Sequence, residues 1–566
     1  MKKLLTALLA LIMVFACVPF AACTPKDDSE KVDKNKTQLY VGIFEGGWGR
    51  EWIDLMKVEF EKQYPTVQVM IEGKKAEFQN TTLEASILAG QNDMYFTTIS
   101  PYSAVAQEND GNKLLDITST VTTPIKDILA DAADPSAFAN ETKTIEQKMD
   151  PYLSTYMKSA SKNKDKYFTI PLYTSFYNIV YDVDLFEEKG YFISSKNAGE
   201  YVWTTGLTGA PAKWAGQDGV LSTADKVSYD DGLPVTYEDF KALCAKLSAE
   251  NVSPIIWASE QSGYRSDYFA TVWANYIGGD EYKRGLMQDG STSSEFGIPI
   301  THENAYELQK SQGKKAALTM AYDIINNGWF DGESKKVTYL EAQDTYVYSK
   351  KKSESGGKRI AMLMEGGWWE NECKATRESM AATYGEGYEN RRFGVMTIPR
   401  FEDTAGITPQ QNKNKVLYSV TTNSTVFIKK NTEKAELAKK FMAFTTTDEM
   451  LRLYTRVTGS TRMYDYALTT EDLAEMSYYK RNLWDYFSDD KTEIVYTHGP
   501  AQMALLNQSY FRNEWNWSAS TTGRNFTEPI SIFMNYPDAT IDEYMNALYE
   551  SHKNGWQALR SSAGLL

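Results

Sequence analysis

The order of apolar and amphipathic segments predicts an α/β protein built around parallel strands. A buried strand at 39–44 is followed by the glycine-rich turn 45–50 and by residues 51–65, whose apolar side chains recur at helical spacing until a proline ends the run. A second strand at 66–73 completes a strand–helix–strand unit, and such a unit requires parallel strands with a right-handed crossover.

The same alternation continues to the end of the chain. Further strands are expected at 94–99, 254–259, 359–364, 393–399 and 420–430. Further helices are expected at 77–89, 100–110, 237–250 and 431–446, with 166–190 running through extended segments into a helix start and 447–566 mostly helical. Thr236, after Pro234, marks the start of the helix at 237–250, and Asn431 or Thr432 is the expected N-cap of the helix at 431–446.

The first 22 residues have the features of a secretory signal peptide. A basic start precedes the apolar run 4–20, and two alanines then precede Cys23. A cysteine in this place is typical of a lipoprotein signal, with Phe20 where leucine is usual, so Cys23 is the expected site of lipid attachment. Residues 23–37 are then the lipidated cysteine and a charged, flexible tether. We expect a lipid-anchored protein on the extracytoplasmic face of the cell membrane.

Composition excludes several classes of function. The net charge of −15 and the lack of a concentrated basic run argue against nucleic acid as a partner. Only 3 histidines are present and they are far apart in the sequence. This number argues against a histidine-based metal site and against a Ser-His triad. We expect no catalytic residue and no cofactor. Cys244 and Cys373 form either one disulfide or two buried free thiols.

Aromatic residues are abundant, with 37 Tyr, 24 Phe and 13 Trp. Extracellular proteins that bind sugars use such a surplus, because flat rings cover the apolar faces of pyranoses. An aromatic-rich core accounts for most of these residues.

Six segments, in order, resemble the extracellular solute-binding proteins of ABC importers, specifically the family 1 carbohydrate binders. The segments are FEKQYPTVQV (60–69), NDMYFTTI (92–99), YFTIPLYTSFYNIVYDVDLFEEKG (167–190), LPVTYEDFKALCAKL (233–247), KRIAMLMEGGWWEN (358–371) and FIKKNTEKAELAKKFMAFTTTDEML (427–451). The resemblance implies a two-lobed, periplasmic-binding-protein-like α/β fold whose hinge-connected lobes close over a ligand. It also implies a carbohydrate ligand and the permease subunits of an ABC transporter as partners, with the protein a monomer.

The resemblance also suggests how the chain is divided. The expected segments are 1–22 signal peptide, 23–37 tether, 38–172 lobe 1, 173–418 lobe 2 with inserts, 419–456 return to lobe 1, and 457–566 a C-terminal helical segment on the lobe 2 or hinge side. Extra sequence relative to typical members hints at an oligosaccharide rather than a monosaccharide.

The ligand site is expected in the loops that follow three strands, since ligands of open α/β sheets bind beyond the carboxyl ends of strands. These loops supply Glu45, Trp48, Ser100, Tyr102, Glu365, Trp368 and Trp369. Glycines there let the backbone approach a ligand, and the rings and carboxylates suit a sugar. Neighbouring residues at a helix start point about 100° apart. We therefore expect one of Trp368 and Trp369 in the cleft and the other in the core.

The segment that leads across between the lobes supplies the other site residues. Tyr181 matches the family's YN tyrosine, with Asp182 in place of the asparagine, and Tyr173, Ser175 and Tyr177 precede it. Trp257 and Asp267 are weaker ligand-binding predictions.

One insert suggests a cation. Residues 217–234 resemble a decayed D-x-DG-type loop whose oxygens could bind calcium. The acidic residues are Asp218, Asp225, Asp230 and Asp231. A solvated acidic loop is the simpler interpretation, because the spacing fits no EF-hand.

Other functions stay open at this stage. They are an extracellular glycoside hydrolase, for which two carboxylates would suffice, a peptide-binding importer component, and a surface adhesin without transport. The first lacks a recognisable acid/nucleophile motif and the second lacks its usual sequence signatures.

Overall fold

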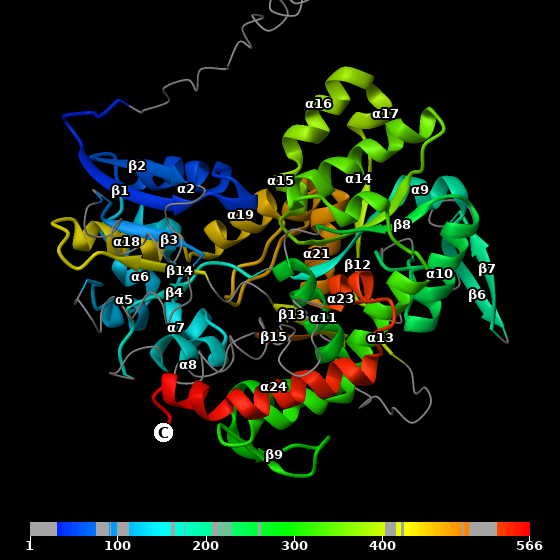
Figure 1. The fold of residues 1–566 in the computed structure, drawn as a ribbon. Coiled ribbons are helices and arrows are strands. Elements are labelled where there is room, and N and C mark those ends of the chain that lie inside the picture. The colour runs from blue at the N-terminus through cyan, green and yellow to red at the C-terminus, as the bar shows by residue number, and fades with distance from the viewer. Residues whose placement is uncertain are drawn as a thin grey trace, which may run out of the picture.

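Two main sheets, each in its own lobe, organise the protein (Figure 1). The computed structural model describes residues 31–74, 90, 92–98, 113–159, 165–174, 176–197, 199–205, 214–216, 221–223, 228–258, 262–401, 415–419, 424–489, 492–496 and 529–566. In Figure 1, lobe 1 lies on the left in blue, cyan and yellow, and lobe 2 on the right, mostly in green.

Lobe 1 contains a five-stranded sheet of order β2-β1-β3-β14-β4. Its strands are β1 (Thr37–Phe44), β2 (Val67–Lys74), β3 (Met94–Thr97), β4 (Ile170–Pro171) and β14 (Thr425–Ile428). Its helices are η1 (Gly46–Trp48), α2 (Glu51–Gln63), α5 (Thr118–Thr122), α6 (Ile125–Ile128), η2 (Pro135–Phe138), α7 (Ile145–Lys148), α8 (Pro151–Ser159), α18 (Ala435–Phe444), α19 (Asp448–Thr458) and α20 (Thr470–Glu475). β1 pairs in parallel with β2 and β3, which confirms the first strand–helix–strand unit.

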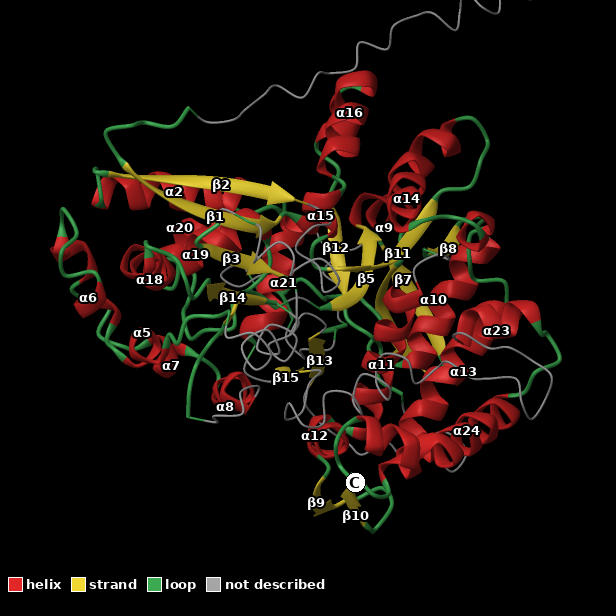
Figure 2. Ribbon diagram, turned by 60° about the vertical axis from the view of Figure 1, so that its left-hand side comes forward, coloured by secondary structure: helices red, strands yellow, loops and turns green. Residues whose placement is uncertain are grey.

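Lobe 2 contains a four-stranded sheet of order β12-β5-β11-β8. Its strands are β5 (Tyr177–Asp182), β8 (Ser253–Ile256), β11 (Ile360–Gly366) and β12 (Phe393–Met396). Its helices are α9 (Val183–Lys189), α10 (Tyr237–Ala249), α11 (Ser262–Ile277), α12 (Gly279–Met287), η3 (Ala305–Lys310), α13 (Gln312–Asn326), η4 (Gly332–Lys335), α14 (Tyr339–Glu354), α15 (Trp369–Glu372), α16 (Lys374–Tyr384), α17 (Glu386–Glu389), α21 (Tyr478–Ser488), α23 (Pro529–Asn535) and α24 (Ile541–Ser562). Figure 2 shows α14 on one side of this sheet and α11 and α13 on the other.

Smaller two-stranded sheets complete the structure. They pair β6 (Phe192–Asn197) with β7 (Glu200–Thr204), β9 (Asp289–Thr292) with β10 (Pro299–Thr301), and β13 (Lys415–Ser419) with β15 (Thr492–Tyr496).

Both main sheets are mixed, because each contains antiparallel pairs beside the predicted parallel ones. β14 runs antiparallel to β3 and β4, and β5 runs antiparallel to β11 and β12. β5 and β14 are the strands that enter each lobe from the other one. The reversal follows from this exchange of chain between the lobes, because neither strand is reached through a crossover helix within its own sheet.

Hydrogen bonds join the segments that cross between the lobes. One crossing leads from β4 to β5, a second reaches β14, and a third follows α19. The Thr174 amide donates to the Thr461 carbonyl at 2.9 Å, and the Tyr173 amide donates to Ser424 Oγ at 3.2 Å. Ser424 Oγ in turn donates to the Tyr173 carbonyl at 2.8 Å. Tyr173 therefore lies on a hydrogen-bonded hinge.

Helix starts follow the capping rules in one predicted place and depart from them in another. Thr236 caps α10 through a reciprocal capping box with Asp239, as expected. The helix expected at 431–446 begins only at Ala435 and has no side-chain cap. The Thr432 hydroxyl accepts from the Lys434 amide at 3.0 Å and donates to Asp93, so it anchors the approach to the helix instead of capping it.

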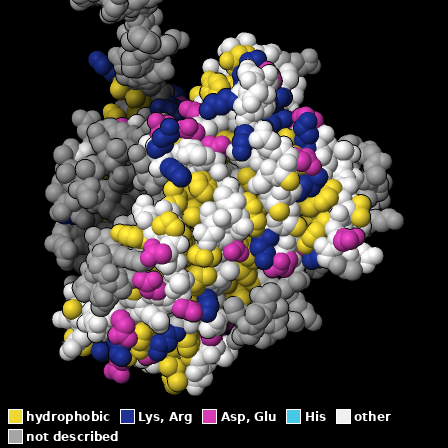
Figure 3. Space-filling model, turned by 45° about the vertical axis from the view of Figure 1, so that its right-hand side comes forward, with side chains coloured by type: hydrophobic (Ala, Val, Ile, Leu, Met, Phe, Trp, Pro, Cys, Tyr) yellow, Lys and Arg dark blue, Asp and Glu magenta, His cyan; other side chains and the backbone are white. Residues whose placement is uncertain are grey.

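The described strands and helices follow the predicted order of segments, whereas the helices predicted at 77–89 and 100–110 lie outside the described residues. The boundaries of the domains stay a prediction. On the face shown in Figure 3, lysine and arginine side chains are interspersed with acidic ones. Within the part of the chain that the structure describes, no helix is long and apolar enough to cross a membrane.

Candidate functional site

Trp48 is placed by the glycine-rich turn directly after β1. Gly46 begins η1 and Gly49 follows it, and they have positive φ values of 47° and 67°, which glycine adopts at little cost. The turn directs Trp48 to the carboxyl end of the lobe 1 sheet, where its ring is 8% exposed. Its indole Nε1 donates to Ser460 Oγ at 2.5 Å, on the hinge segment that follows α19.

Trp368 is placed in the corresponding way by the turn after β11 of lobe 2. It stands at the N-cap of α15. Two glycines make room for its ring: a Cβ on Gly366 would lie 2.3 Å from Trp368 Cη2, and a Cβ on Gly47 would lie 2.8 Å from Trp368 Cδ1. Gly47 belongs to lobe 1, so the backbone of one lobe packs directly against a side chain of the other.

Four rings form a continuous cluster at the junction of the lobes, which we call the aromatic cluster: Trp48, Tyr173, Tyr177 and Trp368. Trp48 lies with its ring centroid 3.9 Å from Tyr173 and 5.5 Å from Trp368. Trp368 meets Tyr177 edge-on at 5.2 Å and 89°. Each lobe contributes one tryptophan, and Tyr173 comes from the hinge between them. Such a group of rings offers stacking faces to a ligand once the lobes separate.

Polar contacts join the lobes around this cluster. Asn371 Nδ2, in α15, donates to the Thr458 carbonyl at the end of α19 at 2.5 Å. Lys374 of α16 and Glu51 of α2 form an exposed ion pair at 3.4 Å. These two contacts link lobe 1 to lobe 2 beside the aromatic cluster.

Glu45 and Glu365, each directly before a Gly-Gly-Trp sequence, lie in different environments. Glu45 is partly exposed and its carboxylate covers Gly73, where a Cβ would lie 1.9 Å from Glu45 Oε1. Glu365 is 1% exposed, below Trp368, and burial followed by the nearby Glu372 carboxylate raises its pKa well above the usual value.

A small cavity borders Tyr177 on the lobe 2 side. It has a volume of about 10 Å³ and lies between β5, β12, α11 and α21, with Tyr177, Asn178 and Thr271 in its wall. Asn178 Oδ1 is buried and has no hydrogen-bond partner within the part of the chain that the structure describes. A space of this size holds about one water molecule, so it is too small to be a ligand pocket.

Two of the predicted site residues lie in the core of lobe 2 instead. Tyr181 is fully buried and packs against Phe186, with ring centroids 4.9 Å apart. Trp369 is also fully buried, 4.8 Å from Phe393 by ring centroids. Both are removed from the aromatic cluster, so we no longer include them among the ligand-binding residues. The pair Trp368–Trp369 thus divides into one ring at the lobe junction and one in the core.

Other predictions fall in the core or outside the described residues. Trp257 is 1% exposed and packs against Phe330, so it too is a core residue. Cys23, Ser100, Tyr102, Ser175 and the side chain of Asp267 lie outside the described residues.

The acidic insert shows no cation site in its described part. Asp230 accepts from Ser228 Oγ at 2.8 Å and Asp231 from the Ser222 amide at 2.8 Å. Asp218 and Asp225 are outside the described residues. Among the residues that are described, no group of three or more His, Cys, Asp or Glu is arranged to hold a metal ion.

Cys244 and Cys373 are both buried free thiols. Burial raises the pKa of each thiol, so neither is a reactive thiolate near neutral pH. Of the two alternatives that the sequence left open, the structure has the unpaired one.

Several residues of the site were missed by sequence reasoning. Asn371, Thr458 and Ser460 contact the aromatic cluster or join the lobes around it, whereas Gly47 lies in the glycine-rich turn that the sequence predicted. Ser460 lies in the segment VTGSTR (457–462), which follows the last of the six family-like segments. That position next to a family-like segment was the signal that the sequence offered for Ser460. Asn371 and Thr458 carry no signal in a single sequence, because their role depends on the contact between lobes.

Comparison with known proteins identifies the fold. A chitin oligosaccharide-binding protein superposes with a TM-score of 0.52 at 12% identity, over 92% of this chain and 100% of that chain. The apo form of RafE from Streptococcus pneumoniae gives 0.50 at 16% identity, over 93% and 99%. The bacterial solute receptor AcbH gives 0.50 at 11% identity, over 92% and 100%.

The sequence matches no protein-family model and no curated protein. At these identities the structural likeness establishes the fold: the chain has the two-lobed α/β fold of solute-binding proteins, as predicted.

Proposed function

We propose that this protein captures a carbohydrate between its two lobes and delivers it to an ABC importer. The observation that carries the proposal is the meeting of Trp48 from lobe 1 with Trp368 from lobe 2, beside Tyr173 on the hinge. All four rings of the aromatic cluster are at most 8% exposed, so a ligand reaches their faces only when the lobes separate. Binding would then shift an equilibrium between open and closed lobes through its higher affinity for one state.

The comparisons support a sugar as the ligand. One structural neighbour is named for binding chitin oligosaccharides, and another for an exclusive preference for β-D-galactopyranose. Tryptophan and tyrosine rings suit pyranoses, because they cover apolar sugar faces while nearby carboxylates accept hydroxyl hydrogen bonds. We propose Trp48, Tyr173, Tyr177 and Trp368 as stacking residues and Glu45 as a hydroxyl acceptor. Ser100 and Tyr102 stay predicted members of the site.

The cellular setting is proposed from the N-terminal sequence. Lipid on Cys23 would tether the mature protein to the extracytoplasmic face of the membrane, close to the permease subunits that receive the sugar. The protein would act as a monomer and carry out no reaction.

A thermal-shift screen with sugars and with peptides tests the class of ligand. A ligand that binds only the folded state stabilises it by about 2.7 kcal/mol at a concentration of 100 times Kd. We expect stabilisation by one or more glycans and by none of the peptides. Stabilisation by peptides alone would favour a peptide-binding importer component, and new reducing ends after incubation with oligosaccharides would favour a glycoside hydrolase.

A further inference from the structure

Glu365 occupies a core-facing position at the end of a central strand. Alternate residues of β11 face opposite sides of the sheet, and Leu363, two residues earlier, belongs to the buried cluster that also contains Trp369 and Tyr346. Glu365 faces the same side and is 1% exposed. A carboxyl group in such a place must be hydrogen-bonded, because leaving it without partners costs several kcal/mol.

The hydrogen bonds of Glu365 lead to Trp368 and to a second carboxyl group. Its own turn supplies the Gly366 amide, 2.9 Å from Oε1, and the Trp368 side chain hydrogen-bonds to the same carboxyl group. From α14, Gln343 Nε2 donates to Glu365 Oε2 at 3.1 Å and to Glu372 Oε2 at 2.6 Å. One neutral amide group therefore stands between two acidic side chains.

Within the described residues, no lysine or arginine is ion-paired with Glu365. In α16, Arg377 is paired with Glu370 at 3.2 Å. In α21, the Tyr479 hydroxyl donates to the Gly366 carbonyl at 3.1 Å. Glu372 of α15, Cys373 directly after it and Tyr339 of α14 are other titratable groups near Glu365. Among the described residues no ion pair involves Glu365, whose carboxyl group shares the Gln343 amide with the carboxyl group of Glu372.

We infer that Glu365 is a positioning residue, which holds the Trp368 ring in the orientation that meets lobe 1. A change in the protonation of Glu365 therefore changes the surroundings of that ring. The inference rests on the proposed function, since the Trp368 face is the proposed sugar platform. It also explains why Glu365 lies under the aromatic cluster and does not line it. Gly366 and Gly47 limit the ring on either side, and Glu365 fixes its polar edge.

Protonation follows from the same arrangement. Burial first, and then the charge of Glu372, raise the pKa of Glu365 well above its usual value. The carboxyl group is thus neutral over a pH range in which an exposed glutamate is charged. Glutamine has the same shape and is neutral, so Glu365→Gln should preserve the position of Trp368, whereas Glu365→Ala should not.

The test is fluorine NMR of the full chain labelled with 5-fluorotryptophan. The chain has 13 tryptophans, and Trp368→Phe and Trp369→Phe assign the two resonances of interest. We expect Glu365→Ala to shift the Trp368 resonance and Glu365→Gln to leave it near its wild-type position, with the Trp369 resonance unchanged in both. In the wild type the Trp368 resonance should move with pH, with a midpoint above 4.5.

Two further variants make this titration specific. Glu365→Gln should abolish the titration, and Glu372→Gln should lower its midpoint by removing the neighbouring charge. The matched control is Glu378→Gln on the exposed face of α16, which should leave the titration unchanged. A Trp368 resonance that is unaffected by Glu365→Ala, or that titrates identically in Glu365→Gln, would overturn the inference.

Calorimetry with the glycan that stabilises the wild type most gives the functional readout. Glu365→Ala should weaken binding by about tenfold, which is the scale of one lost hydrogen bond, and Glu365→Gln should restore it. If no glycan binds, the proposed function fails while the NMR result still decides the role of Glu365. If glycans bind and both variants bind as the wild type does, the positioning role fails on its own.

Discussion

Trp48 and Trp368 meet with their ring centroids 5.5 Å apart and an interplanar angle of 64°, although they follow strands of different sheets in different lobes. Each is the aromatic residue of a Gly-Gly-Trp turn at the carboxyl end of a strand. Both lobes therefore place a tryptophan by the same kind of turn, and the two tryptophans meet at the junction of the lobes.

Replacement of either tryptophan by alanine should weaken sugar binding at least tenfold and leave the fold intact. Trp48 and Trp368 pack at the lobe junction, so their loss affects mainly the contact between lobes and the ligand. Trp369→Ala should instead destabilise lobe 2 by about 3–5 kcal/mol, because a fully buried ring leaves a cavity. Denaturant unfolding and calorimetry on the three variants separate these effects. Equal loss of stability in all three would contradict the assignment.

Gly47→Ala should weaken the closed arrangement of the lobes. Its Cβ would lie 2.8 Å from Trp368 Cδ1, and the contact exists only when lobe 1 meets lobe 2. We expect a larger radius of gyration by X-ray scattering and a lower ligand affinity, with unchanged thermal stability of each lobe. Gly332→Ala is the matched control, since a Cβ there meets nothing within 4 Å. Identical scattering from the two variants would show that Gly47 is not at a moving interface.

The sequence predicted the first strand–helix–strand unit and the division of the adjacent tryptophans, because both depend on local periodicity. Tyr181 was misplaced for a physical reason: every residue of β5 is buried, so the strand shows no polar alternation that would separate a core face from a cleft face. The late start of α18 was missed because Thr432 bonds to Asp93, far away in sequence. Contacts such as Asn371 with Thr458 exist only between lobes, and no local pattern encodes them.

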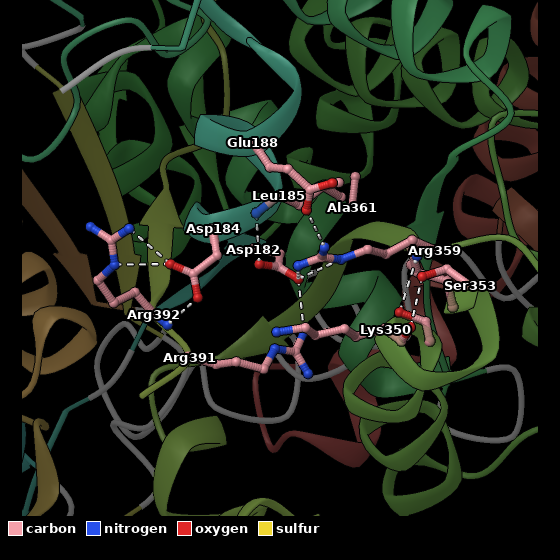
Figure 4. A network of polar contacts seen from close by, with 12 residues as sticks. Asp182, Asp184, Leu185, Glu188, Lys350, Ser353, Arg359, Ala361, Arg391 and Arg392 are labelled. Carbon is pink, nitrogen blue, oxygen red and sulfur yellow. Dashed lines mark hydrogen bonds and ion pairs between the residues drawn. The ribbon is translucent and has the colours of Figure 1, made fainter. Parts of the chain in front are cut away.

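Asp182 should be far more important for stability than the neighbouring Asp184. Figure 4 shows Asp182 between Arg359 and Arg391, each of which donates to its Oδ2 at 2.7 Å. Burial alone would raise the pKa of Asp182, but the two guanidinium groups outweigh burial and hold it below the usual value.

Asp182→Ala removes the buried carboxylate that Arg359 and Arg391 share, leaves Arg359 with only the more exposed Glu188, and should cost about 3–5 kcal/mol. Asp184 pairs with Arg392, whose side chain is 40% exposed, so Asp184→Ala should cost about 1 kcal/mol or less. Urea unfolding measures both variants. A cost for Asp182→Ala as small as that for Asp184→Ala would contradict the view that this network holds lobe 2 together.

The free energy of unfolding should fall as the pH rises through neutrality, because the Glu295 side chain loses its proton in this range. Its carboxylate accepts from the Gln312 amide at 2.5 Å and from Ser311 Oγ at 3.0 Å at the start of α13. Burial is the dominant effect and, with a contribution from Glu281, raises the pKa of Glu295 to about 7. A raised pKa means that the folded state binds the proton more tightly than the unfolded state, so stability is full below about pH 4.5 and is lost as the pH passes 7.

Glu295→Gln should remove this loss, which amounts to about 1–3 kcal/mol between pH 5 and pH 8. Urea unfolding across that range, with the exposed Glu303→Gln as the control, measures the difference from the wild type. Parallel pH profiles for the wild type and Glu295→Gln would show that Glu295 is ionised throughout.

Calorimetric titration with a glycan panel tests the central proposal most directly. The panel should contain chitin oligosaccharides, D-galactose and galactosyl and glucosyl oligosaccharides, titrated into the wild type, Trp48→Ala, Trp368→Ala and the core control Tyr181→Phe. We predict saturable binding of at least one glycan by the wild type and Tyr181→Phe, and at least a tenfold loss, about 1.4 kcal/mol, in both tryptophan variants. Binding of no glycan, or binding that neither tryptophan variant weakens, would contradict sugar capture between the lobes.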